Sequence, residues 1–169
     1  MWAKEWDNIF SKNEWGKYPS EHLVRFFKRN FKKKKLKILE IGSGTGANLW
    51  FFCREGHKVY GLDGSKVALK ICDNFLKKDK FNYKLFHSDA KKLPFKDNFF
   101  DLVVDIECLY SNPIMDAIQI SNEVFRVLKK GSFFYSLTFS NFCTGSTNLK
   151  SKKINNLKFK RNIRFSTIN

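Results

Sequence analysis

The sequence predicts an α/β fold built on a mostly parallel sheet, with helices covering both of its faces. Two observations carry this prediction. Short apolar segments of strand length alternate along the chain with longer segments in which apolar residues recur at helical spacing. A glycine-rich turn at residues 42–46 joins the first apolar segment to the helical segment after it. Strands and helices that alternate in this way form parallel sheets with both faces covered.

The individual elements follow from these patterns in chain order. The expected strands cover residues 37–41, 58–62, 83–88, 99–105 and 133–139. The expected helices cover residues 20–31, 47–55, 65–77 and 114–130. In the last helix, apolar residues from Ile114 to Leu128 recur at helical spacing, and Lys129, Lys130 and Gly131 supply the cations and the glycine that are typical of a helix end.

Acidic residues at the ends of three strands predict the ligand of this fold. Glu40, Asp63 and Asp89 end successive strands, so a parallel sheet would bring their carboxylates to one crevice. The glycines alone also fit a dinucleotide site, with Ala47 in the third small position. A pyrophosphate would be repelled by the carboxylates, whereas S-adenosylmethionine offers them a sulfonium and an ammonium. The sequence therefore favours S-adenosylmethionine as cofactor and leaves NAD as the alternative.

Several blocks of sequence then occur in a characteristic order. These are residues 39–47, 59–65, 88–95, 99–105 and 127–132. Together they resemble class I S-adenosylmethionine-dependent methyltransferases, in the broad group that includes the small-molecule type 11 enzymes, from Trp6 to Phe139. The last block departs slightly, since Lys130-Gly131-Ser132 stands where the family usually has Pro-Gly-Gly. The resemblance implies a Rossmann-like sheet and methyl transfer to a small-molecule acceptor.

The resemblance also implies which residues would hold the cofactor. Glu40 would meet the ammonium group through water, Asp63 would bind the ribose hydroxyls, and Asp89 with the backbone of Ala90 would hold the adenine edge. Asp105 would end the fourth strand beside the reactive methyl group. The complete set implied in cofactor binding is Glu40, Gly42, Ser43, Gly44, Gly46, Asp63, Gly64, Asp89, Ala90 and Asp105.

Catalytic side chains are harder to predict, because an activated methyl group needs alignment and exclusion of water more than it needs a base. Asp105 is the first candidate for a general base, and Glu107, Tyr110 and His22 are further candidates. Structural roles are expected of the two other histidines. His57 lies in the turn between a helix and a strand, and His87 lies inside the third strand.

An aromatic segment precedes the first core helix. The aromatic side chains of this segment, residues 1–19, are those of Trp6, Phe10, Trp15 and Tyr18. In similar enzymes this position folds over the cofactor and helps to form the substrate pocket. The alternative is a hydrophobic cap on the sheet, because aromatic side chains bury a large area wherever they lie.

The C-terminal region predicts an incomplete sheet. A complete class I methyltransferase sheet has a final antiparallel strand pair, and we expect that pair to be missing here, with the fifth strand left as an open edge. We assign residues 1–139 to the cofactor-binding domain and residues 140–169 to a basic, polar tail that is loop-like or partly disordered. The interpretation is a C-terminally shortened methyltransferase, with a non-catalytic cofactor-binding remnant as the alternative.

The formal net charge of +16 raises the question of nucleic acid. Abundant Lys, Asn and Phe also result from a codon bias toward A and T. The run at residues 32–35 precedes the first strand, at the sheet end opposite the ligands, while the run at residues 150–164 could reach the site. The fourth strand also lacks the Asn-Pro-Pro-Tyr signature of many enzymes that methylate amino groups. An RNA methyltransferase is therefore not favoured.

The remaining expectations concern compartment and metals. Cys53, Cys72, Cys108 and Cys143 are widely spaced and lack neighbouring histidines, so we expect reduced thiols and no metal site. The N-terminus lacks the apolar stretch of a signal peptide, and no segment is long enough for a membrane span. We therefore expect a cytoplasmic protein without a membrane partner, and the sequence leaves its oligomeric state open.

Overall fold

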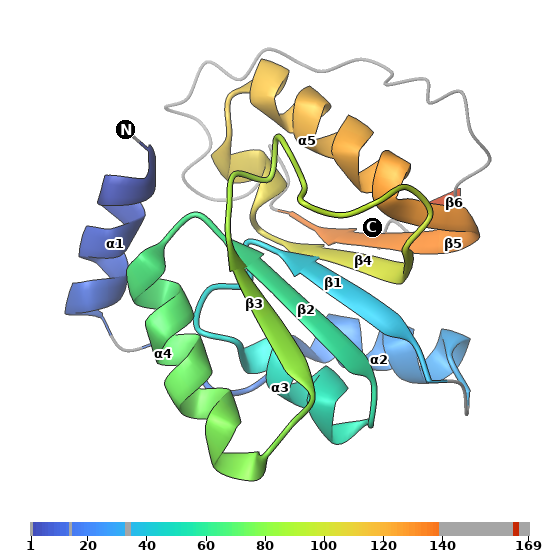
Figure 1. Ribbon diagram of the computed structural model, residues 1–169, viewed down its shortest axis with the longest axis horizontal. Coiled ribbons are helices and arrows are strands. Elements are labelled where there is room, and N and C mark those ends of the chain that lie inside the picture. The colour runs from blue at the N-terminus through green and yellow to red at the C-terminus, as the bar shows by residue number, and fades with distance from the viewer. Residues whose placement is uncertain (1, 14, 33–34, 139–163, 166–169) are drawn as a thin grey trace.

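The computed structural model describes residues 2–13, 15–32, 35–138 and 164–165 (Figure 1). Its helices are α1 (Trp2–Lys12), α2 (Glu21–Asn30), α3 (Ala47–Arg54), α4 (Lys66–Leu76) and α5 (Ile114–Val127), with short 3-10 turns η1 (Lys77–Asp79) and η2 (Leu109–Ser111). Its strands are β1 (Lys37–Ile41), β2 (Lys58–Asp63), β3 (Tyr83–His87), β4 (Phe100–Ile106), β5 (Leu128–Leu137) and β6 (Arg164–Phe165).

The strands form one sheet in the order β3-β2-β1-β4-β5-β6, and every pair of neighbouring strands is parallel. The chain order reverses between β1 and β4, which pair with each other at the centre of the sheet. In open α/β sheets, ligands bind at such a reversal, outside the carboxyl ends of the strands. The predicted fold class is confirmed, and the fold itself provides a crevice beside β1.

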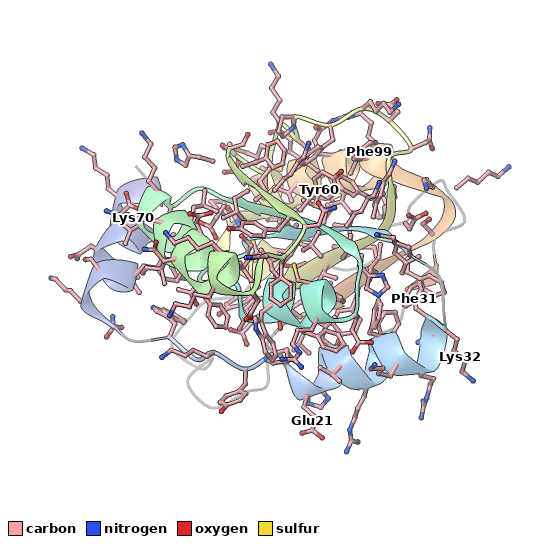
Figure 2. All side chains as sticks on the ribbon, turned by 60° about the horizontal axis from the view of Figure 1, so that its bottom comes forward. Glu21, Phe31, Lys32, Tyr60, Lys70 and Phe99 are labelled. Carbon is pink, nitrogen blue, oxygen red and sulfur yellow. The ribbon has the colours of Figure 1, made fainter. Side chains whose placement is uncertain are left out.

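Two apolar layers hold the helices against the sheet. One layer packs α2, α3 and α4 on the face that carries Ile38, and the other packs α5 on the face that carries Leu39. Figure 1 shows the same division, with α5 on one side of the sheet and α2, α3 and α4 on the other. Figure 2 shows how polar side chains such as Glu21 and Lys32 extend outward from the α2 region. Alternate residues of each strand therefore serve opposite layers, as a sheet buried on both faces requires.

The boundary between α5 and β5 differs from the prediction. The helix ends at Val127 rather than at residue 130, and Leu128 is extended and pairs with Phe100 of β4. Leu102 pairs with Phe133, so the residues between form an irregularity in β5. Gly131, expected as a helix stop, has φ +75° inside this irregularity. Pairing with β4 therefore overrides the helical spacing of the local sequence.

The edge of the sheet beyond β5 also differs from the prediction. Arg164 and Phe165 form β6, which pairs in parallel with Phe133 and Phe134, so this part of β5 is not an open edge. Among the strands that the structure describes, no antiparallel pair occurs. The rest of the predicted tail, residues 140–163 and 166–169, lies outside the described residues.

Candidate functional site

A cavity of about 300 Å³ opens at the carboxyl ends of the central strands. Its walls come from four stretches of the chain: α1 and the segment after it, the glycine turn with the end of β1 and the start of α3, the end of β2, and the end of β4 with the loop after it. Figure 1 shows α1 at the end of the sheet toward which the β1 and β2 arrows point. The cavity therefore lies where the strand order reverses.

The glycine turn can take its shape only because these positions lack a side chain. Gly42, Gly44 and Gly46 have φ values of +64°, +51° and +90°. A Cβ on Gly42 would lie 2.5 Å from the Cβ of Cys108, and one on Gly46 would lie 2.4 Å from the Sγ of Cys72. Both distances are far below van der Waals contact, so the backbone of the turn packs directly against Cys108 and Cys72, and a side chain at either glycine would clash. Ser43 also lines the cavity, although its buried Oγ lies toward Gly61 of β2.

Glu40 presents a buried carboxylate to this cavity, and only 1% of the residue is exposed. Its Oε1 accepts a hydrogen bond of 2.7 Å from the side-chain amide of Asn48, whereas its Oε2 accepts none from the described residues. Burial raises the pKa of Glu40 to about 8; the Asn48 hydrogen bond opposes this shift, and the carboxylates of Asp63 and Asp105 add to it. A buried carboxyl oxygen without a partner is unusual, because nearly all buried polar atoms in proteins are hydrogen-bonded.

Asp63 ends β2 beside the same cavity and is held by backbone groups. Its Oδ2 accepts a 2.8 Å hydrogen bond from the amide of Gly44, and its Oδ1 accepts one of 2.8 Å from the amide of Ser65. Burial raises the pKa of Asp63, while these two hydrogen bonds lower it. Each carboxylate oxygen can accept a second hydrogen bond, so Asp63 retains capacity for a ligand.

A second, narrow cleft of about 10 Å³ adjoins the main cavity. Gly42, Asp63 and Cys108 line both spaces, and Gly64, Asp89 and Ala90 line only the second. Asp89 is exposed, and its Oδ1 accepts a 2.9 Å hydrogen bond from the amide of Lys91. The structure thus brings together, around two adjoining spaces, nine of the ten residues that the sequence predicted for the cofactor: Glu40, Gly42, Ser43, Gly44, Gly46, Asp63, Gly64, Asp89 and Ala90.

Asp105 lies near the carboxyl end of β4, as expected, but it is not part of the cavity wall. It is fully buried, and it lines neither the cavity nor the cleft. Its Oδ1 accepts hydrogen bonds from the amides of Cys108 (2.9 Å) and Leu109 (3.0 Å), and its Oδ2 accepts one of 2.5 Å from the hydroxyl of Ser136. Burial raises its pKa, and these hydrogen bonds oppose the shift. Asp105 shapes the loop after β4, and this geometry gives no support to a catalytic role.

The other candidate bases separate into two groups. Glu107 and Tyr110 line the main cavity, and Glu107 has φ +64°, which is uncommon for a residue other than glycine. His22 is exposed on α2 and does not line the cavity, contrary to the expectation that it lies within reach. His57 accepts a hydrogen bond at Nδ1 from the amide of Leu36, which is the structural position expected of it.

The aromatic segment forms one wall of the cavity. Trp6, Phe10 and Trp15 all line it, with ring centroids 5.7 Å apart for Trp6 and Phe10 and 5.0 Å apart for Phe10 and Trp15. Tyr18 is 87% exposed and does not line the cavity. Two features were not predicted from the sequence: the helical conformation of residues 2–12 and the role of Asn48. This asparagine was detectable as a polar side chain within the apolar run of residues 47–53.

Metal sites and membrane-spanning helices are both absent from the described ranges. Within residues 2–13, 15–32, 35–138 and 164–165, no three His, Cys, Asp or Glu side chains gather as a metal site would require. Every helix in those ranges is too short or too polar to cross a bilayer.

Comparison with known proteins identifies the family. A family model described as a methyltransferase domain matches residues 38–131. The chain is 35% identical over 115 residues to the demethylmenaquinone methyltransferase of Listeria welshimeri, an alignment that covers 60% of this chain and 48% of that protein. The chain thus spans about half the length of the curated relatives it matches.

Solved structures share the fold. One solved structure concerns the conversion of a disulfide bond into a thioacetal group during echinomycin biosynthesis. It aligns with a TM-score of 0.72 at 19% identity, over 79% of this chain and 57% of that chain. The Haemonchus contortus phosphoethanolamine N-methyltransferase 2, solved with S-adenosylhomocysteine, aligns with a TM-score of 0.60 at 25% identity, over 68% of this chain and 27% of that chain. With the family match over the glycine turn and the acidic strand ends, these findings show that the chain belongs to the methyltransferase domain family.

Proposed function

We propose that the chain binds S-adenosylmethionine in the main cavity and transfers its methyl group to a small-molecule acceptor. The observation that carries this proposal is the Oε2 atom of Glu40, a buried carboxylate oxygen that accepts no hydrogen bond from the described residues. An ammonium group, directly or through one water, supplies both the missing donor and a compensating charge. The described residues therefore fit the amino-acid portion of this cofactor.

The same carboxylates oppose a nicotinamide dinucleotide. Glu40 and Asp63 both line the cavity, and Asp63 is close enough to Glu40 to contribute to its raised pKa. Asp63 is also hydrogen-bonded to the glycine turn itself. A pyrophosphate on this turn would add negative charge beside two acidic groups whose ionised forms burial already disfavours, so it would gain no favourable charge interaction there. S-adenosylmethionine gains one, because its sulfonium and ammonium groups are positive.

The remaining assignments are those that the family resemblance implies, and the two adjoining spaces support them. Asp63, which retains capacity to accept hydrogen bonds, would receive the ribose hydroxyls. Asp89 and Ala90 line the narrow cleft and would hold the adenine edge. That cleft is narrow, so we expect the loop after β4 to move when adenine enters. Gly42 and Gly44 would line the methionine portion.

When bound, the sulfonium supplies a methyl group that is already activated. The chain's own residues then need to align the acceptor and exclude water. Trp6, Phe10 and Trp15 would exclude water on one side of the cavity. Glu107 and Tyr110 also line the cavity, and because Tyr110 is 49% exposed, the acceptor would enter beside it. In this proposal the Glu107 carboxylate, which lines the cavity, would take up the proton that an acceptor hydroxyl or amine loses.

The mouth of the cavity favours an acceptor with an apolar part. Trp15 and Tyr110 line the cavity and are 43% and 49% exposed, and Ile114 and Met115, which follow Tyr110 closely in the chain, are 43% and 72% exposed. Of these four side chains, Trp15 and Tyr110 line the cavity, and exposed aromatic side chains at a cavity are typical of binding sites. The relative named for demethylmenaquinone supports a small-molecule acceptor, and a nucleic-acid acceptor has no comparable support.

Calorimetric titration tests the cofactor assignment. Purified chain should bind S-adenosylmethionine and S-adenosylhomocysteine but not NAD. Asp63→Ala should weaken binding by about 10- to 100-fold, because it removes charge-assisted hydrogen bonds to the ribose. Asp79→Ala, at an exposed carboxylate of η1, is the matched control and should bind normally.

Each outcome of this titration has a definite meaning. Binding of NAD alone would favour an oxidoreductase, and absence of binding to the folded chain would overturn the cofactor assignment. A screen for S-adenosylhomocysteine release with small-molecule acceptors then tests transfer. Tight cofactor binding without transfer to any acceptor class would favour the non-catalytic remnant.

A further inference from the structure

One contact ties the aromatic wall to the body of the domain across a long stretch of sequence. Oδ1 of Asp7, on α1, accepts hydrogen bonds from the hydroxyl of Ser65 (2.5 Å) and the amide of Val67 (3.2 Å). Val67 lies in the first turn of α4, and Ser65 is the N-cap residue of that helix. Figure 1 shows α1 and α4 side by side, and α4 is the helix against which α1 mainly packs. Asp7 therefore joins α1 to the N-terminal turn of α4.

The chemistry of this contact suits an ionised carboxylate. The first amides of a helix lack partners within the helix and carry partial positive charge, which favours an anion. The hydrogen bonds from Ser65 and Val67 lower the pKa of Asp7. The side chain is therefore charged near neutral pH, when its contact with α4 is strongest.

The contact continues into the proposed cofactor site. Ser65 is fully buried, and its amide donates to Oδ1 of Asp63 at 2.8 Å, while the other oxygen of Asp63 accepts from the amide of Gly44 at 2.8 Å. Hydrogen bonds thus run from Asp7 through Ser65 and Asp63 to the glycine turn. Each bond in this series joins two different elements or a loop to an element, so displacement of α1 reaches Asp63 through a single intervening residue.

The same helix carries the aromatic wall. Trp6 precedes Asp7, and Phe10 follows it by about one helical turn. Both line the cavity, and Phe10 is only 8% exposed. Carbon atoms of the Phe10 ring lie 3.6 Å and 3.7 Å from the position of a Cβ on Gly44. The position of α1 therefore decides whether Phe10 covers the glycine turn.

We propose that Asp7 is a positioning residue that latches α1 onto the start of α4, and that this latch couples closure of the aromatic wall to ligand binding at Asp63. The proposal rests on the proposed function for the ligand, S-adenosylmethionine. The latch is the Asp7–Ser65 contact, and it is present in the chain without bound cofactor. Loss of the latch frees α1 and uncovers the glycine turn, and bound cofactor stabilises α1 further only where the latch is intact.

Hydrogen exchange and calorimetry test this inference with matched variants. Asp7→Ala removes both hydrogen bonds, and Asp7→Asn keeps an oxygen that accepts them without the charge. Glu5→Gln removes a charge from an exposed position of the same helix and serves as the control. Asp7→Ala should speed exchange of the α1 amides and weaken S-adenosylmethionine binding, each by about 5- to 30-fold. Asp7→Asn should give exchange rates and affinities between those of Asp7→Ala and the wild type.

The second readout separates a latch from a simple helix cap. In the wild-type chain, S-adenosylmethionine should slow exchange in α1 as well as at the glycine turn; in Asp7→Ala, only the glycine turn should respond. A cap without coupling would alter α4 and leave the response of α1 to the ligand intact, and that result would overturn the proposal. Ser65→Ala removes the hydroxyl that donates to Asp7 and keeps the backbone amide that donates to Asp63, but it also removes the hydrogen bond from the Ala68 amide that caps α4 and leaves the bond from Val67 to Asp7. If Asp7→Ala folds poorly, Ser65→Ala should therefore show the same loss of the α1 response to the ligand, with a smaller effect on α1 exchange.

Failure of the latch and failure of the cofactor assignment are distinguishable. If wild-type chain does not bind S-adenosylmethionine, the proposed function is overturned. The latch is then judged by ligand-free exchange alone, where equal α1 exchange in wild type, Asp7→Ala and Ser65→Ala would overturn it.

Discussion

Glu40 occupies a position where a carboxylate destabilises the ligand-free chain. The remaining residues of its strand from Ile38 to Ile41 are apolar and fully buried, whereas Glu40 places an acidic group beside Asp63 and Asp105 in the same interior. Burial of a charge without a full set of partners is costly, and the neutral form is favoured. A cationic ligand removes that cost, so binding and the ionisation of Glu40 are linked.

This linkage predicts how stability depends on pH. The folded chain keeps a proton on Glu40 up to a pKa of about 8, while the unfolded chain releases it near the ordinary value of 4.5. The folded state then binds more protons, so Glu40 makes the free energy of unfolding fall as pH rises between those values, by up to about 1.4 kcal/mol per pH unit. Glu40→Gln should lack this contribution.

Urea denaturation of ligand-free protein at several pH values from about 5 to 8 measures the effect. The stability of Glu40→Gln relative to wild type should increase steadily with pH, and Glu5→Gln should show no such trend. A constant difference across that range would contradict the predicted linkage. The same Glu40→Gln variant should bind S-adenosylmethionine more weakly.

Arg126 of α5 organises the segment between β3 and β4. Its guanidinium donates to the carbonyls of Phe95 (2.7 Å) and Leu93 (3.0 Å), and it also pairs with Asp97 and Glu123. Glu123 in turn accepts a 2.8 Å hydrogen bond from the amide of Leu93. This side-chain cluster holds the segment that leads from Asp89 and Ala90, so α5 stabilises the proposed adenine end of the site from a distance.

Replacement of Arg126 by lysine tests this role. Lysine keeps the positive charge but lacks the planar set of donors that reaches two carbonyls and two carboxylates. Arg126→Lys should lower the free energy of unfolding by about 1–3 kcal/mol, because part-buried acceptors lose their donors. Chemical denaturation gives the value. Arg25→Lys, in an ion pair with Glu21 whose side chains are 78% and 73% exposed, should change stability by less than about 0.5 kcal/mol. Equal effects of the two substitutions would argue against this role.

The charge of the whole chain is separate from the chemistry of the site. The chain has 32 Lys and Arg residues and 16 Asp and Glu residues, a formal net charge of +16. Lys32 and Lys35 precede β1 and so lie at the amino edge of the sheet, as predicted, while Glu40 and Asp63 line the cavity at the carboxyl edge. The basic residues before β1 are therefore not positioned to attract an anionic substrate to the cavity.

A net charge of this size should make stability depend on salt. Like charges repel one another more strongly in the compact state, and salt screens that repulsion. Raising NaCl from about 20 to about 200 mM should increase Tm by roughly 2–4 °C, equivalent to about 1 kcal/mol for a chain of this size. Differential scanning calorimetry measures the change, with an uncharged solute of equal osmolality as the control. A Tm that falls with NaCl would show that attractive ion pairs dominate instead.

Local patterns were sufficient to predict β1 to β4, the core helices, and the glycines and strand-end carboxylates around the crevice, while the family resemblance supplied the rest of the predicted cofactor residues. An apolar run, a glycine turn and an acidic strand end each depend on neighbours in sequence, so Glu40, Gly42 and Asp63 could be selected from these patterns alone. Their roles toward a cofactor stay a prediction that titration must test. The family match agrees with the fold and the methyltransferase assignment.

Contacts between residues far apart in sequence account for the rest. Pairing with Phe100 moves Leu128 from helix to strand, the hydroxyl of Ser136 holds Asp105 inside the domain, and Ser65 holds Asp7 from 58 positions away. None of these outcomes has a periodic or motif signal, because each depends on which side chains the completed sheet brings within hydrogen-bonding distance. Local sequence is therefore enough to specify the central strands of the sheet, the crevice and the acidic groups beside it. Packing in three dimensions selects which carboxylates face the cavity and which hold the chain together.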